Sequence, residues 1–181
     1  MRQTNTKFII VNALAFQVVW FICVQGNNTL ALAAGVMAIL FHFAIFKPDQ
    51  TERTLMTWVI GLGILGDNLI LNTGFVEYSN SYTLLNFSFS PLWLVALWFA
   101  FGTTLLHSMR WLLESPKLAG LLGFLVVPFS YYAGIKLSDS VLAEGMAGYL
   151  FFVLEGTLWA CLLFIASVSY KRRRALLCEF S

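Results

Sequence analysis

Long apolar runs separated by short polar links dominate the hydrophobic pattern of this chain. Six runs stand out, and each is close to the ~20 residues that an α-helix needs to cross a bilayer. They cover residues 8–25, 30–46, 55–74, 91–109, 118–135 and 145–169. The pattern predicts an all-α, polytopic membrane protein with six transmembrane helices, folded as a single helical-bundle domain over residues 1–181.

The links between these runs indicate how neighbouring helices connect. Residues 26–29 (GNNT) are typical of a turn and predict a tight hairpin of the first two helices, while residues 47–53 predict a polar loop. The link at 75–90 is aromatic and polar and contains no Lys or Arg. It predicts a short amphipathic piece in the membrane interface or a loop, after which Pro91 suits the first turn of the fourth helix.

Composition excludes a soluble globular domain. The chain is 59% hydrophobic and only 11% charged, whereas soluble domains carry roughly 25% charged residues. The solvent of its surface is therefore a lipid bilayer. Nucleic acid is not an expected partner, because the basic residues lie between apolar runs rather than on one soluble face. The spacing of Cys23, Cys161 and Cys178 favours neither a disulfide nor a zinc site.

The distribution of Lys and Arg predicts the orientation in the membrane. If the six runs alternate in direction, ten of the eleven basic residues fall on one side and only Lys136 falls on the other. The ten are Arg2, Lys7, Lys47, Arg53, Arg110, Lys117 and the four residues 171–174. Because positive charge collects on the cytoplasmic side, we expect both termini in the cytoplasm.

The third run contains a charged residue that requires a protein partner. Asp67 inside a membrane helix costs at least ~2.5–3.5 kcal/mol unless it is paired or hydrated. It shares a helical stripe with Gly63 and Gly74, and such glycines allow a neighbouring helix to approach closely. We therefore expect Asp67 to face protein, with Asn68 and Asn72 on the adjacent stripe.

The sixth run offers the partner. Glu155 lies on a stripe with Phe151 and Trp159, at a depth in the bilayer close to that of Asp67. Two carboxylates that share a site do not both ionise, so the pair predicts an acid–base centre or a cation ligand. We expect Asp67 and Glu155 to be the catalytic residues of a polar pocket that Asn68, Asn72 and Tyr132 also line; the alternative is that both carboxyl groups only fix packing.

The two histidines allow a second interpretation. His42 and His107 both fall in the cytoplasmic half, where a histidine pair with a carboxylate could bind a metal. No HxxH or HxxxH spacing occurs, and Asp67 and Glu155 lie further out, so we expect no metal and no cofactor. His107 and Arg110 instead predict an interfacial cluster for a lipid phosphate. The expected substrate-binding residues are thus Asn68, Asn72, His107, Arg110 and Tyr132.

Several segments resemble a known family. Residues 90–113 (SPLWLVALWFAFGTTLLHSMRWLL), 116–123 (PKLAGLLG) and 128–134 (PFSYYAG), with Gly66-Asp67 followed by Gly74, are similar to small bacterial inner-membrane proteins known as domain of unknown function 2878. The resemblance implies a bacterial inner (cytoplasmic) membrane location and carries no established activity or catalytic residue. Members resemble components encoded among lipid-modifying enzymes, which implies such enzymes as partners.

These features favour three functional hypotheses. The first is an enzyme, or an enzyme partner, that acts on a lipid or another apolar molecule entering from the bilayer, with Asp67 or Glu155 as acid or base. The second is a small secondary transporter that couples transport to protons through the same carboxylates. The third is a non-catalytic scaffold that holds other enzymes at the membrane.

Overall fold

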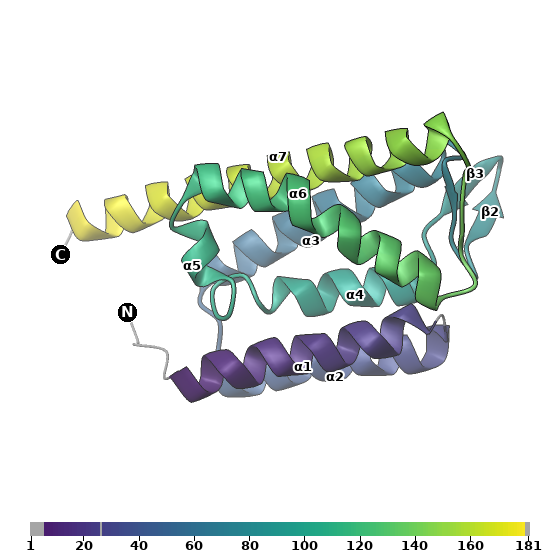
Figure 1. Ribbon diagram of the computed structural model, residues 1–181. Helices are drawn as coiled ribbons and strands as arrows, with labels where there is room; N and C mark the ends of the chain where they lie inside the picture. Colours follow the sequence, from purple (N-terminus) through teal and green to yellow (C-terminus); the bar gives the residue numbers. More distant parts are fainter. Residues whose placement is uncertain (1–5, 26, 180–181) are drawn as a thin grey trace.

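The structure is a computed structural model that describes residues 6–25 and 27–179 (Figure 1). Arg2 and Gly26, which entered the charge and turn predictions, lie outside the described residues, as does the side chain of Cys178. Helices account for most of the described chain. They are α1 (Thr6–Val24), α2 (Asn28–Phe46), α3 (Gln50–Leu71), α4 (Leu92–Gly102), α5 (Arg110–Leu113), α6 (Pro116–Leu137) and α7 (Met146–Glu179).

Local sequence explains where three of these helices begin. The Asn27 side chain accepts a hydrogen bond from the Leu30 backbone N–H, which caps α2. Asp49 caps α3 in the same way through the Glu52 N–H, at 2.8 Å, so α3 starts inside the segment that the sequence predicted as a loop. Pro116 starts α6 at a position where its missing N–H costs nothing.

Within the described residues, five helices are long and apolar enough to cross a membrane: α1, α2, α3, α6 and α7. The predicted run at 91–109 differs from these. Its helix, α4, ends at Gly102, because the backbone N–H groups of Thr103 and Thr104 turn back to the Ala100 and Phe101 carbonyls. Turns then lead through residue 109 to α5. At its C-terminus α7 extends beyond the predicted boundary of 169, through the basic residues 171–174.

Residues 75–90 contain three short strands joined by turns, which the sequence did not predict. β1 (Val76–Glu77) pairs antiparallel with β4 (Val141–Leu142), and β2 (Tyr82–Leu84) pairs with β3 (Phe87–Phe89). Leu85 and Asn86 join β2 and β3 with φ angles of 51° and 63°, as a two-residue hairpin turn requires. The fold is therefore mostly helical, with two small ladders at one end (Figure 1).

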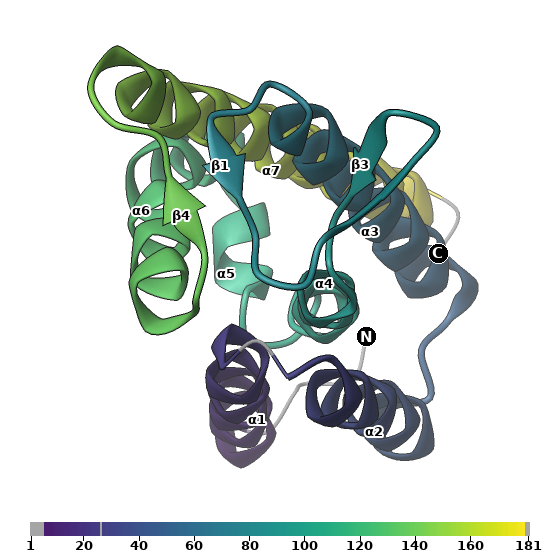
Figure 2. The ribbon, with the colours of Figure 1, turned by 90° about the vertical axis from the view of Figure 1, so that its right-hand side faces the viewer.

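The helices surround α4. Seen end-on, α4 lies at the centre of the bundle and packs against α1, α2 and α3, while α7 packs against α3 and α6 (Figure 2). The indole of Trp98 on α4 stacks on that of Trp159 on α7, with centroids 4.6 Å apart. A Cβ on Gly123 of α6 would lie 2.7 Å from the Trp159 carbonyl oxygen, so α6 and α7 approach closely there.

Candidate buried acidic site

Asp67 is fully buried, and both of its carboxylate oxygens accept hydrogen bonds. The indole N–H of Trp98 donates to Oδ2 at 2.6 Å, and the Tyr131 hydroxyl donates to Oδ1 at 2.8 Å. The indole of Trp98 occupies the space that a side chain at Gly63 would fill. The expectation that Asp67 faces protein is confirmed, although Gly74 lies in a turn beyond α3, with φ 73°, and so does not share its stripe.

Tyr131, rather than the predicted Tyr132, is the α6 tyrosine at this site. Its hydroxyl also accepts a hydrogen bond from the Trp159 indole N–H at 3.4 Å. Tyr132 is 44% exposed on the outer face of α6, where its ring contacts Phe152 and the Lys136 ammonium. Neighbouring positions on a helix point about 100° apart, so only one of the two tyrosines can face the interior.

Glu155 is the second buried carboxyl group of the site. Its exposed fraction is 0%, as is that of Phe151 one turn earlier. It interacts electrostatically with Asp67 and with the Tyr78 hydroxyl. Among the described residues, however, neither carboxyl oxygen of Glu155 has a partner in hydrogen-bond geometry. The structure thus brings the two predicted carboxyl groups into one buried cluster with Tyr78 and Tyr131, which we call the acidic chamber, and it leaves Glu155 able to bond a further group.

Tyr78 closes this chamber from the strand end. It follows β1 and is 4% exposed, with its ring packed edge-on against Trp93. Burial raises the pKa of the Tyr78 phenol well above its ordinary value, and the charges of Glu155 and Asp67 raise it further. Tyr78 is therefore a neutral hydroxyl that can donate a hydrogen bond toward the carboxyl groups.

Asn68 and Asn72 connect α3 to the strand region rather than lining the chamber. The Asn68 carboxamide accepts from the Ser90 backbone N–H at 2.7 Å. Asn72 pairs with Ser88 in both directions, accepting from its N–H at 2.8 Å and donating to its carbonyl at 2.7 Å. Their contacts hold the β2–β3 hairpin against the end of α3.

A cavity of about 330 Å³ adjoins the acidic chamber. Its walls come from α1, α4, α6 and α7 and are mostly apolar. Trp98, Tyr131 and Trp159 belong to this wall, so the residues that bond Asp67, directly or through Tyr131, also face the cavity. Gln17 and Ser130 add polar groups to the lining. An apolar space with a few convergent polar groups is typical of a small-molecule site.

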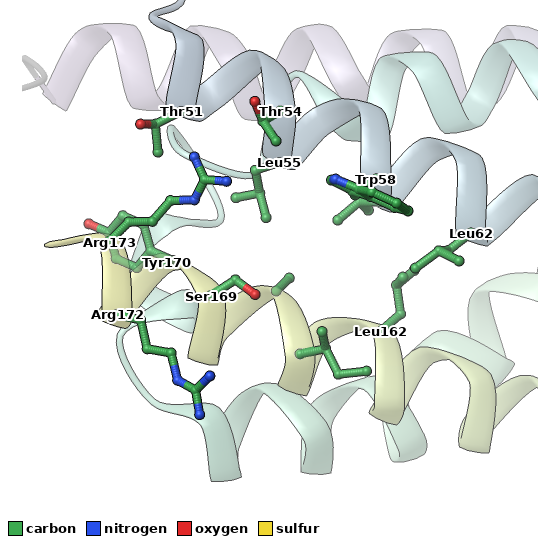
Figure 3. Close-up of a pocket in the computed structure, with 13 residues that line it drawn as sticks. Thr51, Thr54, Leu55, Trp58, Leu62, Leu162, Ser169, Tyr170, Arg172 and Arg173 are labelled. Atoms are coloured by element: carbon green, nitrogen blue, oxygen red, sulfur yellow. The ribbon is translucent and has the colours of Figure 1, made fainter. Parts of the chain in front are cut away.

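A second groove, of about 390 Å³, lies between α3 and α7 near the end that carries α5. Figure 3 shows its apolar walls, including Trp58, Leu62 and Leu162. Two arginines of α7 lie at one end, where Arg173 points toward Thr51 and Thr54 of α3 and Arg172 points away (Figure 3). The groove therefore combines an apolar slot with positive charge.

The two remaining predicted site residues lie apart from Asp67. His107 contacts Glu52, with Nε2 and Oε1 2.9 Å apart, and Arg110 donates from Nε to the Tyr170 hydroxyl at 3.0 Å. Arg110 also lies 3.9 Å from Glu114. His107 thus contacts α3 and Arg110 contacts α7, and neither side chain lies in the acidic chamber.

The fold and its buried polar groups define a multi-pass integral membrane protein, because five apolar helices of bilayer-spanning length surround the site. Comparison with protein families identifies it further. The chain belongs to the family described as protein of unknown function (DUF2878), whose model matches residues 9–165. Neither the curated proteins nor the solved structures include a match to the chain.

Proposed function

We propose that this protein binds an apolar or amphipathic molecule that enters from the bilayer, and that it acts on this molecule, alone or with a partner enzyme, by proton transfer. One observation carries the proposal: Tyr131 faces a 330 Å³ apolar cavity and simultaneously donates its hydroxyl hydrogen to the buried Asp67. A ligand in the cavity would thus meet a hydroxyl whose proton a carboxylate can accept.

The residues of the chamber have distinct roles in this proposal. Tyr131 contacts the ligand and exchanges the proton. Asp67 is the base behind it, oriented by the Trp98 indole N–H. Glu155, whose oxygens have no hydrogen-bond partner among the described residues, is the second acid–base group, as two carboxyl groups that share a chamber divide one proton between them.

A lipid is the ligand class that the surroundings favour. The cavity itself is mostly apolar. The α3–α7 groove, which shares no lining residue with this cavity, offers a separate apolar slot for an acyl chain, and Arg172 and Arg173 at its end would attract an anionic headgroup. His107 and Arg110, proposed from the sequence for a headgroup, lie in the turns before α5 and at the start of α5, and α5 lies toward the end of the bundle where α7 terminates (Figure 1).

A matched pair of substitutions on α1 tests ligand binding. Both Ala13 and Ala15 are exposed, but Ala13 lines the cavity and Ala15, two residues further along, does not. Ala13→Trp should fill the cavity and abolish co-purification of bound lipid, measured by native mass spectrometry from nanodiscs. Ala15→Trp should leave it unchanged. Equal lipid occupancy in both variants would contradict binding in the cavity.

Membrane lipid profiles test the proton transfer. In a strain that lacks this gene, wild-type protein should restore the parental profile, whereas Tyr131→Phe and Asp67→Asn should not. Tyr132→Phe is the control, because Tyr132 lies outside the chamber. An unchanged profile on deletion, with pH-dependent solute flux that Asp67→Asn abolishes, would replace this proposal with a proton-coupled carrier.

We further propose six membrane crossings, with residues 92–113 as the fourth, and both termini in the cytoplasm of a bacterial cell. The basic residues support this orientation: Lys47, Arg53, Arg110 and Lys117 belong to the end of the bundle where α1 begins and α7 ends, while Lys136 belongs to the strand end (Figure 1). Reporter fusions after residue 47 and after residue 139 should give opposite locations; the same location for both would exclude this topology.

A further inference from the structure

The only two histidines of the chain converge on one carboxylate. Nε2 of His42 lies 3.0 Å from Oε1 of Glu52, and Nε2 of His107 lies 2.9 Å from the same oxygen. One possible ligand atom from each residue lies within 4.8 Å of the other two. We call these three residues the histidine–glutamate cluster.

Three separate parts of the fold supply the cluster. His42 lies in the last turns of α2, Glu52 in the first turn of α3, and His107 in the turns between α4 and α5. The turns that carry His107 are held in place by Asn12 of α1, which is 6% exposed. Its side chain donates to the Thr103 carbonyl at 3.2 Å and accepts from the Ser108 hydroxyl at 2.7 Å.

Asn12 therefore stabilises the irregular backbone of residues 103–109, which separates α4 from α5. In membrane proteins, irregular backbone is tolerated where it is buried in protein groups that satisfy it or where it lines a cavity. The turns that follow α4 present His107 to Glu52, with His107 Nε2 2.9 Å from Glu52 Oε1.

Several imidazole nitrogen atoms of the cluster are buried without a hydrogen-bond partner among the described residues. The His42 side chain is 1% exposed, and that of His107 10%. His42 Nε2 approaches Glu52 without the alignment of a hydrogen bond, and among the described residues the Nδ1 atoms of both rings also have no partner. A buried imidazole without hydrogen bonds is costly, unless another ligand uses its lone pair.

We propose that the histidine–glutamate cluster binds a divalent first-row transition metal ion, with one nitrogen from each histidine and a Glu52 oxygen as its three protein ligands. Two histidines and one carboxylate are a ligand set that zinc and non-haem iron both accept, with a further position left open. Bonds of about 2.0–2.1 Å in a tetrahedral site place ligand atoms roughly 3.3 Å apart. The observed 2.9 and 3.0 Å need only a slight widening.

The site is independent of the acidic chamber. It uses neither Asp67 nor Glu155, and Phe46 covers one side of it, with its ring 4.0 Å from that of His107. The exposed fraction of the Glu52 side chain, 11%, leaves a narrow approach for an ion. Thiolates are absent from the cluster, so the set favours an ion of intermediate softness, and zinc is the natural probe.

Zinc binding by the purified full-length protein tests the proposal. The protein should carry an affinity tag without histidine, because its own two histidines are then the only ones present. After removal of metal with a chelator, titration of Zn²⁺ against a competing fluorescent chelator should give one ion per chain. Glu52→Gln and His107→Gln should each weaken binding at least about 100-fold, as loss of a direct ligand exceeds the 10–100-fold cost of losing a supporting group.

Glu114→Gln is the matched control, because Glu114 is an exposed carboxylate near the same end of the bundle whose partners are Arg110 and Arg174. It should bind zinc as the wild type does. Nuclear magnetic resonance of ¹⁵N-histidine provides a second readout, which does not depend on a variant folding correctly. Both histidines should shift together on addition of one equivalent of Zn²⁺.

Two results would overturn the proposal. Equal zinc affinity in wild type, Glu52→Gln and His107→Gln would indicate adventitious surface binding. Histidine signals that do not respond to Zn²⁺ would show that the three side chains form a hydrogen-bonded cluster only.

Discussion

The acidic chamber and the histidine–glutamate cluster both bury a carboxylate of α3, but they surround it with different chemistry. Asp67 accepts from an indole and a phenol, which are neutral donors on α4 and α6. Glu52 faces two imidazoles, whose nitrogen atoms can donate, accept or bind a metal. The first arrangement fixes a proton acceptor in place, whereas the second gathers metal ligands.

Asp67 and Glu52 also lie at different positions along α3, and these positions agree with the difference in their surroundings. Asp67 lies near the C-terminal end of the helix and is fully buried, and its partners are large aromatic side chains that exclude ions and water. Glu52 lies in the first turn, near the basic end, where ions from the aqueous phase can arrive. One helix thus carries two carboxylates whose environments assign them to different tasks.

The largest effect is expected in the chamber, from loss of the central indole. Trp98→Ala removes the donor to Asp67 and the stacking partner of Trp159, and we expect it to cost about 3–5 kcal/mol of stability. Trp58→Ala, at a position 64% exposed, is the control. Chemical unfolding in detergent, followed by fluorescence, measures both. Equal loss in the two variants would contradict a central role for the Trp98–Asp67 pair.

Zinc should stabilise the folded protein through the histidine–glutamate cluster and not through the acidic chamber. At a free Zn²⁺ concentration 100 times Kd, binding to the native state adds about 2.7 kcal/mol. Thermal unfolding should therefore shift upward with Zn²⁺ and return when a chelator is added. The shift should persist in Asp67→Asn and vanish in Glu52→Gln; a shift retained in Glu52→Gln would place the metal elsewhere.

Removal of the Tyr131 hydroxyl tests the contribution of one hydrogen bond in the acidic chamber to stability. Tyr131→Phe leaves Oδ1 of Asp67 without its donor at 2.8 Å, and an unsatisfied buried acceptor costs about 1–3 kcal/mol. Tyr132→Phe removes the same atom from the adjacent, exposed ring and should change stability by less than about 0.5 kcal/mol. The midpoints of denaturant unfolding compare the pair, and the reverse order would exclude Tyr131 as the partner of Asp67.

The smallest expected effect is that of Asn12, whose hydrogen bonds hold the turns that carry His107 of the histidine–glutamate cluster. Asn12→Ala removes the bonds to Thr103 and Ser108, and we expect a loss of about 1 kcal/mol. Because these bonds position His107, zinc affinity should also fall, by about 10-fold, as for other supporting groups of metal sites. Gln17→Ala on the same helix is the control, measured by the same zinc titration. Unchanged affinity in Asn12→Ala would mean that the turns hold His107 without it.

The sequence predicted most of the helical framework, because long apolar runs and helix caps leave few alternatives. The boundaries failed where local signals were short. Two- and three-residue strands at 76–89 are too brief to produce a periodic pattern, and α4 ends at Gly102 although the apolar run continues. There the side chain of Asn12, from a distant part of the chain, stabilises the turns.

The site shows the same division. The cost of burying a charge predicted that Asp67 and Glu155 turn inward, and both are fully buried. Which of the adjacent residues Tyr131 and Tyr132 faces the interior depends on the rotation of α6 about its own axis. A single sequence does not determine that rotation. Glu52 was missed because residues 47–53 were interpreted as a loop. The spacing Asp49-x-x-Glu52, which is a helix-start signature, was the available signal.

The short β1–β4 ladder ties the segment after α3 to the segment between α6 and α7. Val76 pairs with Leu142, and the Phe75 carbonyl accepts from the Ala143 N–H at 2.9 Å. While these bonds hold, α6 and α3 cannot separate at that end. The cavity of about 330 Å³, however, is lined by α1, α4, α6 and α7 and not by α3, so the ladder does not restrict a separation of α1 from α6, and we expect a guest molecule to enter between those two helices.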